Sequence, residues 1–387
     1  MSALTSLWSS PRVRSIAIQA ALAAVLVAIV VFIADNTIAN LRRLHVNSGF
    51  RFLWQPSGFA INQTLIPYSE ASSYFTAFLV ALLNTLVLSA CGIFFATIIG
   101  FVIGIARLSS NWLISRLAAV YVETLRNIPL LLQIFFWYFA ILRPLPGPRQ
   151  SVSLFWGTGL LNNRGLYLPA PVVESGWGVL IALLVAIIAV IAVGAWARQR
   201  QAASGVRPPV FGPGLLLLVG LPAVTALLTG FSLHWDRPQL VGFNLQGGLA
   251  VIPEFVAMLL ALSLYIAAFI AEIVRADILS VSGGQVEAAR ALGLRRRLIY
   301  RLVIVPQALR VILPPLTNQY VNLIKASSLA AAIAYPDLML IFAGTVLNQT
   351  GQALEVMTIT MAVYLTISLA VSLLMNLYNR HIALVER

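Results

Sequence analysis

The polar residues between positions 322 and 337 have the types and spacing to bind a small charged molecule. Asn322, Lys325, Ser327, Ser328 and Asp337 interrupt a proline-broken stretch that is otherwise apolar. A zwitterion needs an acceptor for its ammonium group and donors for its carboxylate. Asp337 could accept, while hydroxyls, amides and freed backbone N–H groups could donate. The alternative is structural, with Lys325 reaching for the membrane surface and Asp337 capping the helix that follows it.

The motifs of common enzymes are missing from the sequence. The only lysine, Lys325, follows Ile324, so a G-x-x-x-x-G-K-[ST] phosphate loop is absent. G-x-S-x-G, H-E-x-x-H and C-x-x-C motifs are absent too. His45, His234 and His381 lie far apart, and we therefore expect no metal site. We expect no catalysis and no cofactor in this chain itself.

A short polar segment, residues 282–297, is too short to span a membrane. Ser282 and Gln285 have the spacing of a capping box, and Gly293 is placed to end the helix in the left-handed conformation. Small residues within it would let another backbone approach closely. Two hypotheses follow: a connector on the lipid surface whose Arg295–Arg297 bind headgroups, or a coupling helix that docks into a cytoplasmic ATPase.

The same segment carries a spaced signature. Glu287-Ala288-Ala289 is followed after three residues by Gly293 and, nine residues later, by Val303-Ile304-Val305-Pro306. This resembles the E-A-A-x-x-x-G…I-x-L-P signature of bacterial ABC importer permeases, with valine in place of Ile and Leu. In that family the loop inserts into a groove on the ATP-binding subunit. The resemblance implies ATPase coupling through Gln285, Glu287, Ala288, Ala289, Gly293, Leu294 and Arg295.

Two further stretches narrow the resemblance. Residues 123–133 look like the R-x-x-P-x-L-x-Q stretch of polar amino-acid permeases, and residues 322–329 are similar to their K-[DN]-[ST]-S-L stretch, with Ala326 departing from it. The likeness covers about 75–142 and 249–377. Together with an insertion at 143–248, it resembles the larger eight-span permease subunits of general L-amino acid ABC transporters. A broad range of L-amino acids is implied by that resemblance.

Charged pairs stand near the predicted inner ends of two spans. Glu123 with Arg126, and Glu272 with Arg275, are three residues apart and could form local ion pairs. Pro129 removes a backbone donor and can kink its helix, which opens a gap that a substrate path could use. We therefore expect a path that includes Asn127, Asn322, Ser327, Ser328 and Asp337.

The composition supplies the elements that would position these residues. Of 387 residues, 60% are apolar and only 10% charged, too apolar for a soluble fold and too poor in charge for a disordered chain. A span needs about 20 mostly apolar residues. The fold class is therefore an all-α integral membrane protein with about eight spans, near 15–34, 75–104, 116–142, 177–197, 213–230, 249–276, 308–346 and 356–377.

Arginine distribution predicts the orientation. The net charge is +13, and most arginines fall in segments that would be cytoplasmic if both termini are inside. The first span could be a signal peptide, but its apolar run is long and no clear cleavage site follows, which favours an uncleaved anchor. We expect a multi-pass protein of the bacterial inner membrane.

We expect four parts in the chain: an N-terminal anchor and periplasmic segment at 1–74, the first part of a five-span core at 75–142, an insertion at 143–248 with a long polar periplasmic loop at 143–176 and two spans, and the second core part with the EAA loop at 249–387. The resemblance implies four kinds of partner besides membrane lipid: an ABC ATPase dimer that holds ATP and Mg, a smaller homologous permease, a periplasmic amino-acid-binding protein and the amino-acid substrate. We expect no nucleic acid. The rival hypothesis is an ion-coupled transporter or channel that works without ATP.

Overall fold

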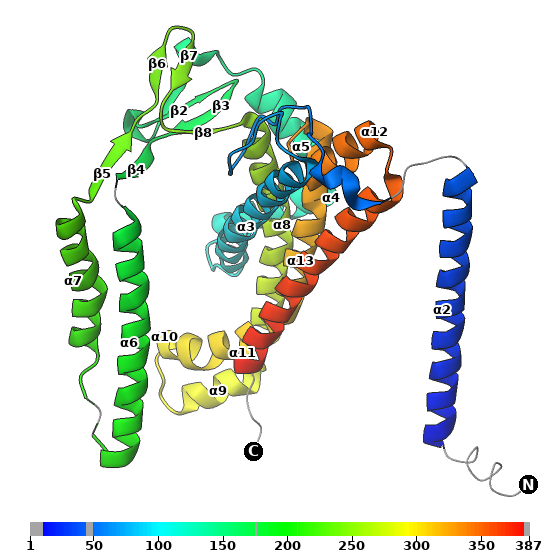
Figure 1. Ribbon diagram of the computed structural model, residues 1–387. Coiled ribbons are helices and arrows are strands. Elements are labelled where there is room, and N and C mark those ends of the chain that lie inside the picture. Colours follow the sequence, from blue (N-terminus) through cyan, green and yellow to red (C-terminus); the bar gives the residue numbers. More distant parts are fainter. Residues whose placement is uncertain (1–10, 44–48, 175, 207, 383–387) are drawn as a thin grey trace, which may run out of the picture. The chain divides into compact units, whose positions relative to one another are not determined.

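The computed structural model describes residues 11–43, 49–174, 176–206 and 208–382. It is mostly helical, as predicted (Figure 1). The chain divides into two compact units. The first comprises Met1–Leu131 with Leu259–Arg387, and the second comprises Leu132–Met258. A compact unit is defined by contacts alone, so the four-part division of the chain stays a prediction.

The first unit is built from long helices joined by short helical turns. Before and after the second unit its elements are α2 (Pro11–Arg43), η1 (Phe50–Trp54), α3 (Tyr74–Arg107), α4 (Trp112–Asn127), α8 (Pro253–Leu279), α9 (Gly283–Ala291), α10 (Arg296–Ile299), η5 (Tyr300–Ile304), α11 (Val305–Ala326), η6 (Ser327–Ile333), η7 (Met339–Val346), α12 (Leu347–Thr350) and α13 (Ala353–Ile382). The helix α8 begins in the second unit and continues into the first.

The membrane spans agree with the predicted pattern. Six described helices are long and apolar enough to cross a membrane, and a seventh candidate is a pair of helices broken at Ile128–Pro129. The break confirms the interruption expected at Pro129. At the remaining predicted span, residues 15–34, the helix α2 carries an apolar stretch over Ala17–Ile33. Its side chains from Ile18 to Ile33 are all exposed, which suits a helix surrounded by lipid.

Glycines let α3 and α8 approach closely. Gly100 and Gly104 lie one turn apart on α3 and are both buried. A Cβ atom at Gly104 would stand 2.8 Å from the carbonyl oxygen of Ala271, and one at Gly100 would stand 2.6 Å from the Cβ of Ile270. Small residues spaced by four are a common means of packing helices within membranes. No larger side chain fits at these two positions without moving α8.

The helix α11 packs against both α3 and α8. Ile312 and Leu316 join Ile270 and Val274 in one buried cluster, and the Tyr320 hydroxyl lies 2.9 Å from that of Thr97 on α3. From Arg296 to Ile333 the chain forms one candidate span. It ends at a residue in the left-handed conformation, Ala334. One crossing followed by a broken segment is what the prolines of this region predicted.

The second unit holds the inserted helices and a small set of strands. The elements are α5 (Leu130–Phe135), η2 (Phe136–Leu142), η3 (Pro148–Gln150), β1 (Val152–Leu154), η4 (Phe155–Gly157), β2 (Gly159–Asn162), β3 (Gly165–Leu168), β4 (Ala170–Glu174), α6 (Gly176–Ser204), α7 (Phe211–Thr229), β5 (Ser232–Asp236), β6 (Gln239–Val241), β7 (Asn244–Gln246) and β8 (Leu249–Val251). The pair α6 and α7 forms a hairpin, and β4 pairs antiparallel with β5 at its open end (Figure 1).

The strands are an addition to the predicted all-α fold. Residues 143–176 were expected to form a polar loop, but they contribute to a four-stranded sheet in the order β1-β2-β3-β8. The pairing of β3 with β8 joins the segment before α6 to the segment before α8. These strands are three to five residues long, too short for a clear alternation of apolar and polar residues to be visible.

We predict that Gly104→Ala lowers the free energy of unfolding by about 1–3 kcal/mol, because the added methyl group overpacks the contact with α8. The matched control is Gly194→Ala on α6, where no atom lies within 4 Å of the added Cβ. The control should be neutral or slightly stabilising, since alanine is the better helix former. Thermal unfolding of both purified variants in detergent measures the difference; equal stabilities would contradict the close approach.

Candidate functional site

The helix α9 ends in a fully formed Schellman motif. Gly293 has φ +71°, its N–H donates to the carbonyl of Arg290 at 2.9 Å, and the N–H of Leu294 donates to the carbonyl of Ala289 at 3.2 Å. This confirms Gly293 as the left-handed terminator. The predicted capping box is wrong: Ser282 is the N-cap, but its side chain makes no capping hydrogen bond. The backbone N–H of Gln285 instead donates to the carbonyl of Ser282 at 3.1 Å.

The two alanines of the signature differ in exposure. Ala289 is only 4% exposed and packs in a cluster with Ile299 and Ile304 of the same chain. Ala289 therefore fixes α9 against the helix that follows, and its expected part in coupling to the ATPase stays a prediction. Ala288 is exposed, and so are Gln285, Glu287, Gly293 and Arg295, while Leu294 is half-buried. The outward face of α9 thus keeps most of the residues expected to couple.

A polar pocket lies between α8 and α11. Its volume is about 510 Å³, and it is lined by Tyr265, Ile266, Phe269, Gln319, Asn322, Lys325, Ala326, Ser328 and Leu329. Gln319, Asn322 and Lys325 are spaced by three along α11, so they share one face of that helix. The pocket therefore combines one ammonium group, two amides, two hydroxyls and two aromatic rings. Such a set can bind a carboxylate and an ammonium group together.

A second pocket of about 350 Å³ shares Lys325 and Ser328 with the first. Its other walls come from the start of η7 and from α13, with Met339, Met357, Thr360, Met361, Tyr364, Leu365 and Ser368. This pocket is mostly apolar, and the flexible side chains of its methionines suit a surface that accepts different shapes. Lys325 thus stands where a polar and an apolar pocket meet.

The structure divides the expected path residues into three groups. Asn322 and Ser328 line the polar pocket. Ser327 is fully buried and donates to the carbonyl of Ile324 at 2.7 Å, so its expected contact with substrate is not supported. Asn127, the last residue of α4, is exposed but is not among the residues that line either pocket.

Asp337 is a helix cap in this structure. It is fully buried, and one carboxylate oxygen accepts the N–H of Leu340 at 2.8 Å. The other lies 3.4 Å from the Tyr364 hydroxyl. The capping hypothesis is confirmed. Asp337 lines neither pocket, and its contact with substrate stays a prediction.

The turn before Asp337 is held by α3. The Asn84 amide donates to the carbonyl of Pro336 at 2.9 Å, and the N–H of Leu338 donates to the Thr85 hydroxyl at 3.0 Å. The Tyr335 hydroxyl donates to the carbonyl of Asn84 at 3.1 Å. Buried backbone groups freed by the helix break are therefore satisfied by side chains.

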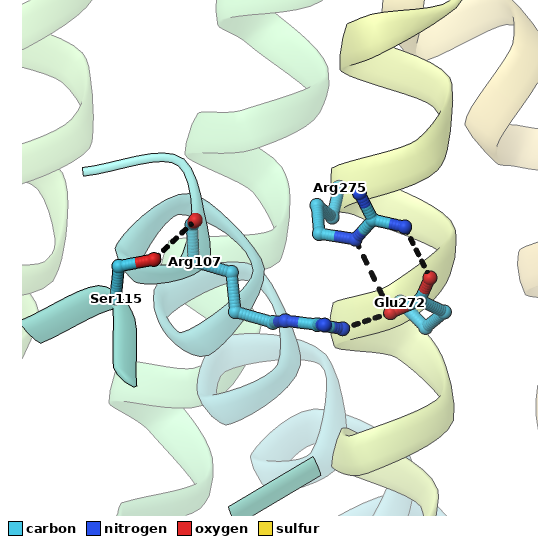
Figure 2. Close-up of polar contacts among 4 residues, drawn as sticks. All are labelled: Arg107, Ser115, Glu272 and Arg275. Carbon is cyan, nitrogen blue, oxygen red and sulfur yellow. Dashed lines mark hydrogen bonds and ion pairs between the residues drawn. The ribbon is translucent and has the colours of Figure 1, made fainter. Parts of the chain in front are cut away.

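Glu272 is shared by two arginines at one end of α3 and α8 (Figure 2). Arg275 donates from Nη2 to one carboxylate oxygen at 2.6 Å and from Nε to the other at 3.3 Å. Arg107, the last residue of α3, also pairs with Glu272. The Ser115 hydroxyl donates to the carbonyl of Arg107 at 3.0 Å, which adds α4 to the cluster. The predicted pair of Glu272 and Arg275 is confirmed.

Three functional candidates were missed by the sequence reasoning. Tyr265 and Phe269 are four residues apart on α8 and form one wall of the polar pocket, and Gln319 precedes Asn322 on α11. The spacing of Gln319 and Asn322 was a usable signal, whereas the aromatic residues look like any others in an apolar span. Arg126, expected to pair with Glu123, instead lies with its guanidinium carbon 5.0 Å from the centre of the Phe269 ring.

Comparison with known proteins identifies the family. Residues 209–384 match the model of the binding-protein-dependent transport system inner membrane component. The chain is 52% identical to the general L-amino acid transport system permease protein AapQ of Rhizobium johnstonii, over 97% of this chain and 94% of that protein. The chain belongs to the amino-acid ABC transporter permeases.

Two other relatives of this permease match over nearly the full length. It is 51% identical to YhdX of Escherichia coli K12, provisionally named an amino-acid ABC transporter permease, over 98% of this chain and 97% of that protein. It is 45% identical to the glutamate/glutamine/aspartate/asparagine permease BztB of Rhodobacter capsulatus, over 99% and 97%. The chain is therefore a multi-pass membrane permease subunit, which decides against the ion-coupled transporter.

We predict that Asp337→Ala lowers stability by about 1–2 kcal/mol, because the Leu340 N–H loses its capping acceptor. Asp337→Asn should stay close to wild type, since asparagine caps helices about as well as aspartate. Thermal unfolding of the purified variants measures both. If Asp337 bound the substrate, the Asp337→Asn variant would instead lose amino-acid uptake per molecule while its stability stayed unchanged.

Proposed function

We propose that this permease is one of two membrane subunits of an ATP-driven importer of L-amino acids in the bacterial inner membrane. Separate ATPase subunits hold ATP and Mg, and this chain carries no cofactor and catalyses nothing. A periplasmic binding protein delivers the substrate. Both termini are cytoplasmic, which places α9 on the side of the ATPase.

The exposed face of α9 is the observation that carries this proposal. The helix is short and polar, is stopped at Gly293, and is fixed through Ala289 to the beginning of a membrane span. A contact made by Glu287 and Ala288 would therefore be passed to that span without a flexible linker between them. This is what coupling of nucleotide-driven movement to a transport path requires.

The polar pocket supplies the substrate site. Lys325 provides a positive charge for the substrate carboxylate, and the amide oxygens of Gln319 and Asn322 with the Tyr265 hydroxyl provide acceptors for the ammonium group. These groups match the backbone portion that all amino acids share. The neighbouring pocket with its methionines can receive side chains of different sizes, which supports a broad substrate range.

The second permease is proposed to be a smaller homologue that pairs with this chain. Named relatives of shorter length support this: GltJ of Escherichia coli K12, a glutamate/aspartate import permease, is 28% identical over 78% of this chain. The strands of the second unit lie in segments predicted to be periplasmic, where they are suited to contact the binding protein. Membrane lipid surrounds the spans.

We predict that Gly293→Val weakens coupling more than Gly293→Asn. Any L-residue other than glycine meets a penalty of about 1–2 kcal/mol in the left-handed region, and asparagine tolerates it best. No atom lies within 4 Å of the added Cβ, so a change at this position acts through the backbone alone. ATPase co-purification and substrate-stimulated ATP hydrolysis of the assembled transporter are the measurements.

The control for Gly293 is Gly283→Val at the other end of α9, where the added side chain also meets no atom within 4 Å and φ is not positive. It should couple nearly normally. If Gly293→Val retains the ATPase and hydrolyses ATP like wild type, α9 is only a connector.

We predict that Asn322→Ala raises the KM for amino-acid uptake about tenfold, because a buried charged group of the substrate loses a hydrogen bond worth about 1.5 kcal/mol. The matched control is Asn318→Ala, one turn earlier on α11, which is exposed and does not line the pocket. Uptake into proteoliposomes that contain the whole transporter measures both. Equal effects of the two variants would exclude the pocket as the substrate site.

A further inference from the structure

A small basic pocket lies in the angle between α9 and the helix that follows it. Its volume is about 280 Å³, and its walls are Val286, Arg290, Leu294, Arg296, Ile299, Tyr300 and Ile304. One wall comes from α9 and the other from α10 and η5, which stand beside it (Figure 1). The pocket shares no residue with the two pockets around Lys325, and of the residues expected to couple to the ATPase only Leu294 lines it.

The two arginines of this pocket have no acidic partner within the described part of the chain. The ion pairs at Glu272 are made by Arg107 and Arg275 and include neither of them. Arg296 stacks with its guanidinium carbon 5.9 Å from the centre of the Tyr300 ring, an arrangement that holds the group in place. Residues 283–301 contain five arginines and one glutamate. Two guanidinium groups in one cavity, one of them stacked on Tyr300, make a binding site for an anion such as a phosphate group.

The occupant does not come from the side proposed for the ATPase. Successive helix residues are about 100° apart, so Ala288 points about 200° away from Val286. Val286 and Arg290 line the pocket, whereas Ala288 is exposed on the opposite face of α9. A partner on the outward face of α9 therefore leaves the pocket accessible.

The position of the pocket selects a lipid as the source of the anion. Arg296 begins the helical stretch Arg296–Ile333, which holds a candidate span. In the proposed orientation this arginine-rich end lies on the cytoplasmic side of the apolar window, where the headgroups are. Its wall is amphipathic: Arg290 and Arg296 supply charge, and Ile299 and Ile304 supply aliphatic surface. A phospholipid offers a phosphate next to a glycerol and acyl chains. Basic pockets on the cytoplasmic side of membrane proteins bind anionic headgroups in this way.

We propose that the pocket between α9 and η5 binds the phosphate headgroup of one anionic phospholipid. The lipid bridges Arg290 of the coupling helix and Arg296 of the span, and thereby steadies the angle between them. This inference rests on the proposed function in one respect only, namely that α9 lies on the cytoplasmic side of the membrane. Lipid binding by the purified chain can be measured without transport, so the two proposals fail independently.

The test compares two double variants of equal charge by native mass spectrometry. Arg290→Gln with Arg296→Gln removes both guanidinium groups from the pocket. Arg297→Gln with Arg301→Gln removes two exposed arginines of the same segment that do not line it. The purified full chain is titrated with phosphatidylglycerol and, separately, with phosphatidylcholine.

The wild type should hold one phosphatidylglycerol in preference to phosphatidylcholine. The pocket variant should bind it about tenfold more weakly, given the attraction of each basic residue to anionic lipid, and the control variant should stay within about twofold of wild type. Arg290→Lys with Arg296→Lys should keep most of the binding, which separates loss of charge from loss of the fold.

Three results would overturn the proposal. Equal losses in both glutamine variants would mean diffuse attraction to a basic surface. Unchanged binding in the pocket variant would mean that the lipid sits elsewhere. Displacement of the lipid by glycerol 3-phosphate at equal concentration would assign the pocket to a soluble phosphate ester instead.

Discussion

The close approach of α3 and α8 is the constraint on which the first unit depends. Gly100 and Gly104 remove the side chains that would hold the two helices apart, and Glu272 then reaches Arg107 across the same contact. An ion pair at the edge of a membrane contributes little by itself, but here it stands on helices already fixed by packing. The helix α11 fills the remaining side of this contact, which in turn places Lys325 and Asn322 opposite Tyr265.

The sequence was informative wherever the physics was local or periodic. Long apolar runs predicted the spans, because a bilayer demands a fixed length of apolar helix. Gly293 was identifiable as a helix terminator, because only a residue without Cβ adopts its conformation freely. The break at Pro129 and the pair of Glu272 and Arg275 follow from rules that involve one helix only. Composition left the 283–294 segment open between a connector on the lipid surface and a coupling helix, and the family resemblance favoured the coupling helix.

What the sequence could not show has a different cause, namely contacts between segments far apart in the chain. Ala289 looked equivalent to Ala288 until Ile299 and Ile304 covered it. Asp337 had a plausible partner in a substrate, but Leu340 and Tyr364 already occupy its oxygens. The guanidinium group of Arg126 lies over the ring of Phe269 and does not pair with Glu123, its neighbour on the same helix. The strand β3 pairs with β8 across eighty residues of intervening chain, and no local pattern in the sequence predicts such a pairing.

The single span Arg296–Ile333 carries the angle with α9 at its beginning and Lys325 close to its end. At about 1.5 Å per residue these two points are roughly 40 Å apart along one rod. Over this length, a tilt of about 3° at the end that carries α9 would displace the ammonium group of Lys325 by about 2 Å. The left-handed turn at Ala334 sets the far limit of the rod, beyond which the next segment is anchored to α3 by Asn84 and Thr85. In the proposed coupling, movement that enters at α9 is therefore carried along this helix to the pocket.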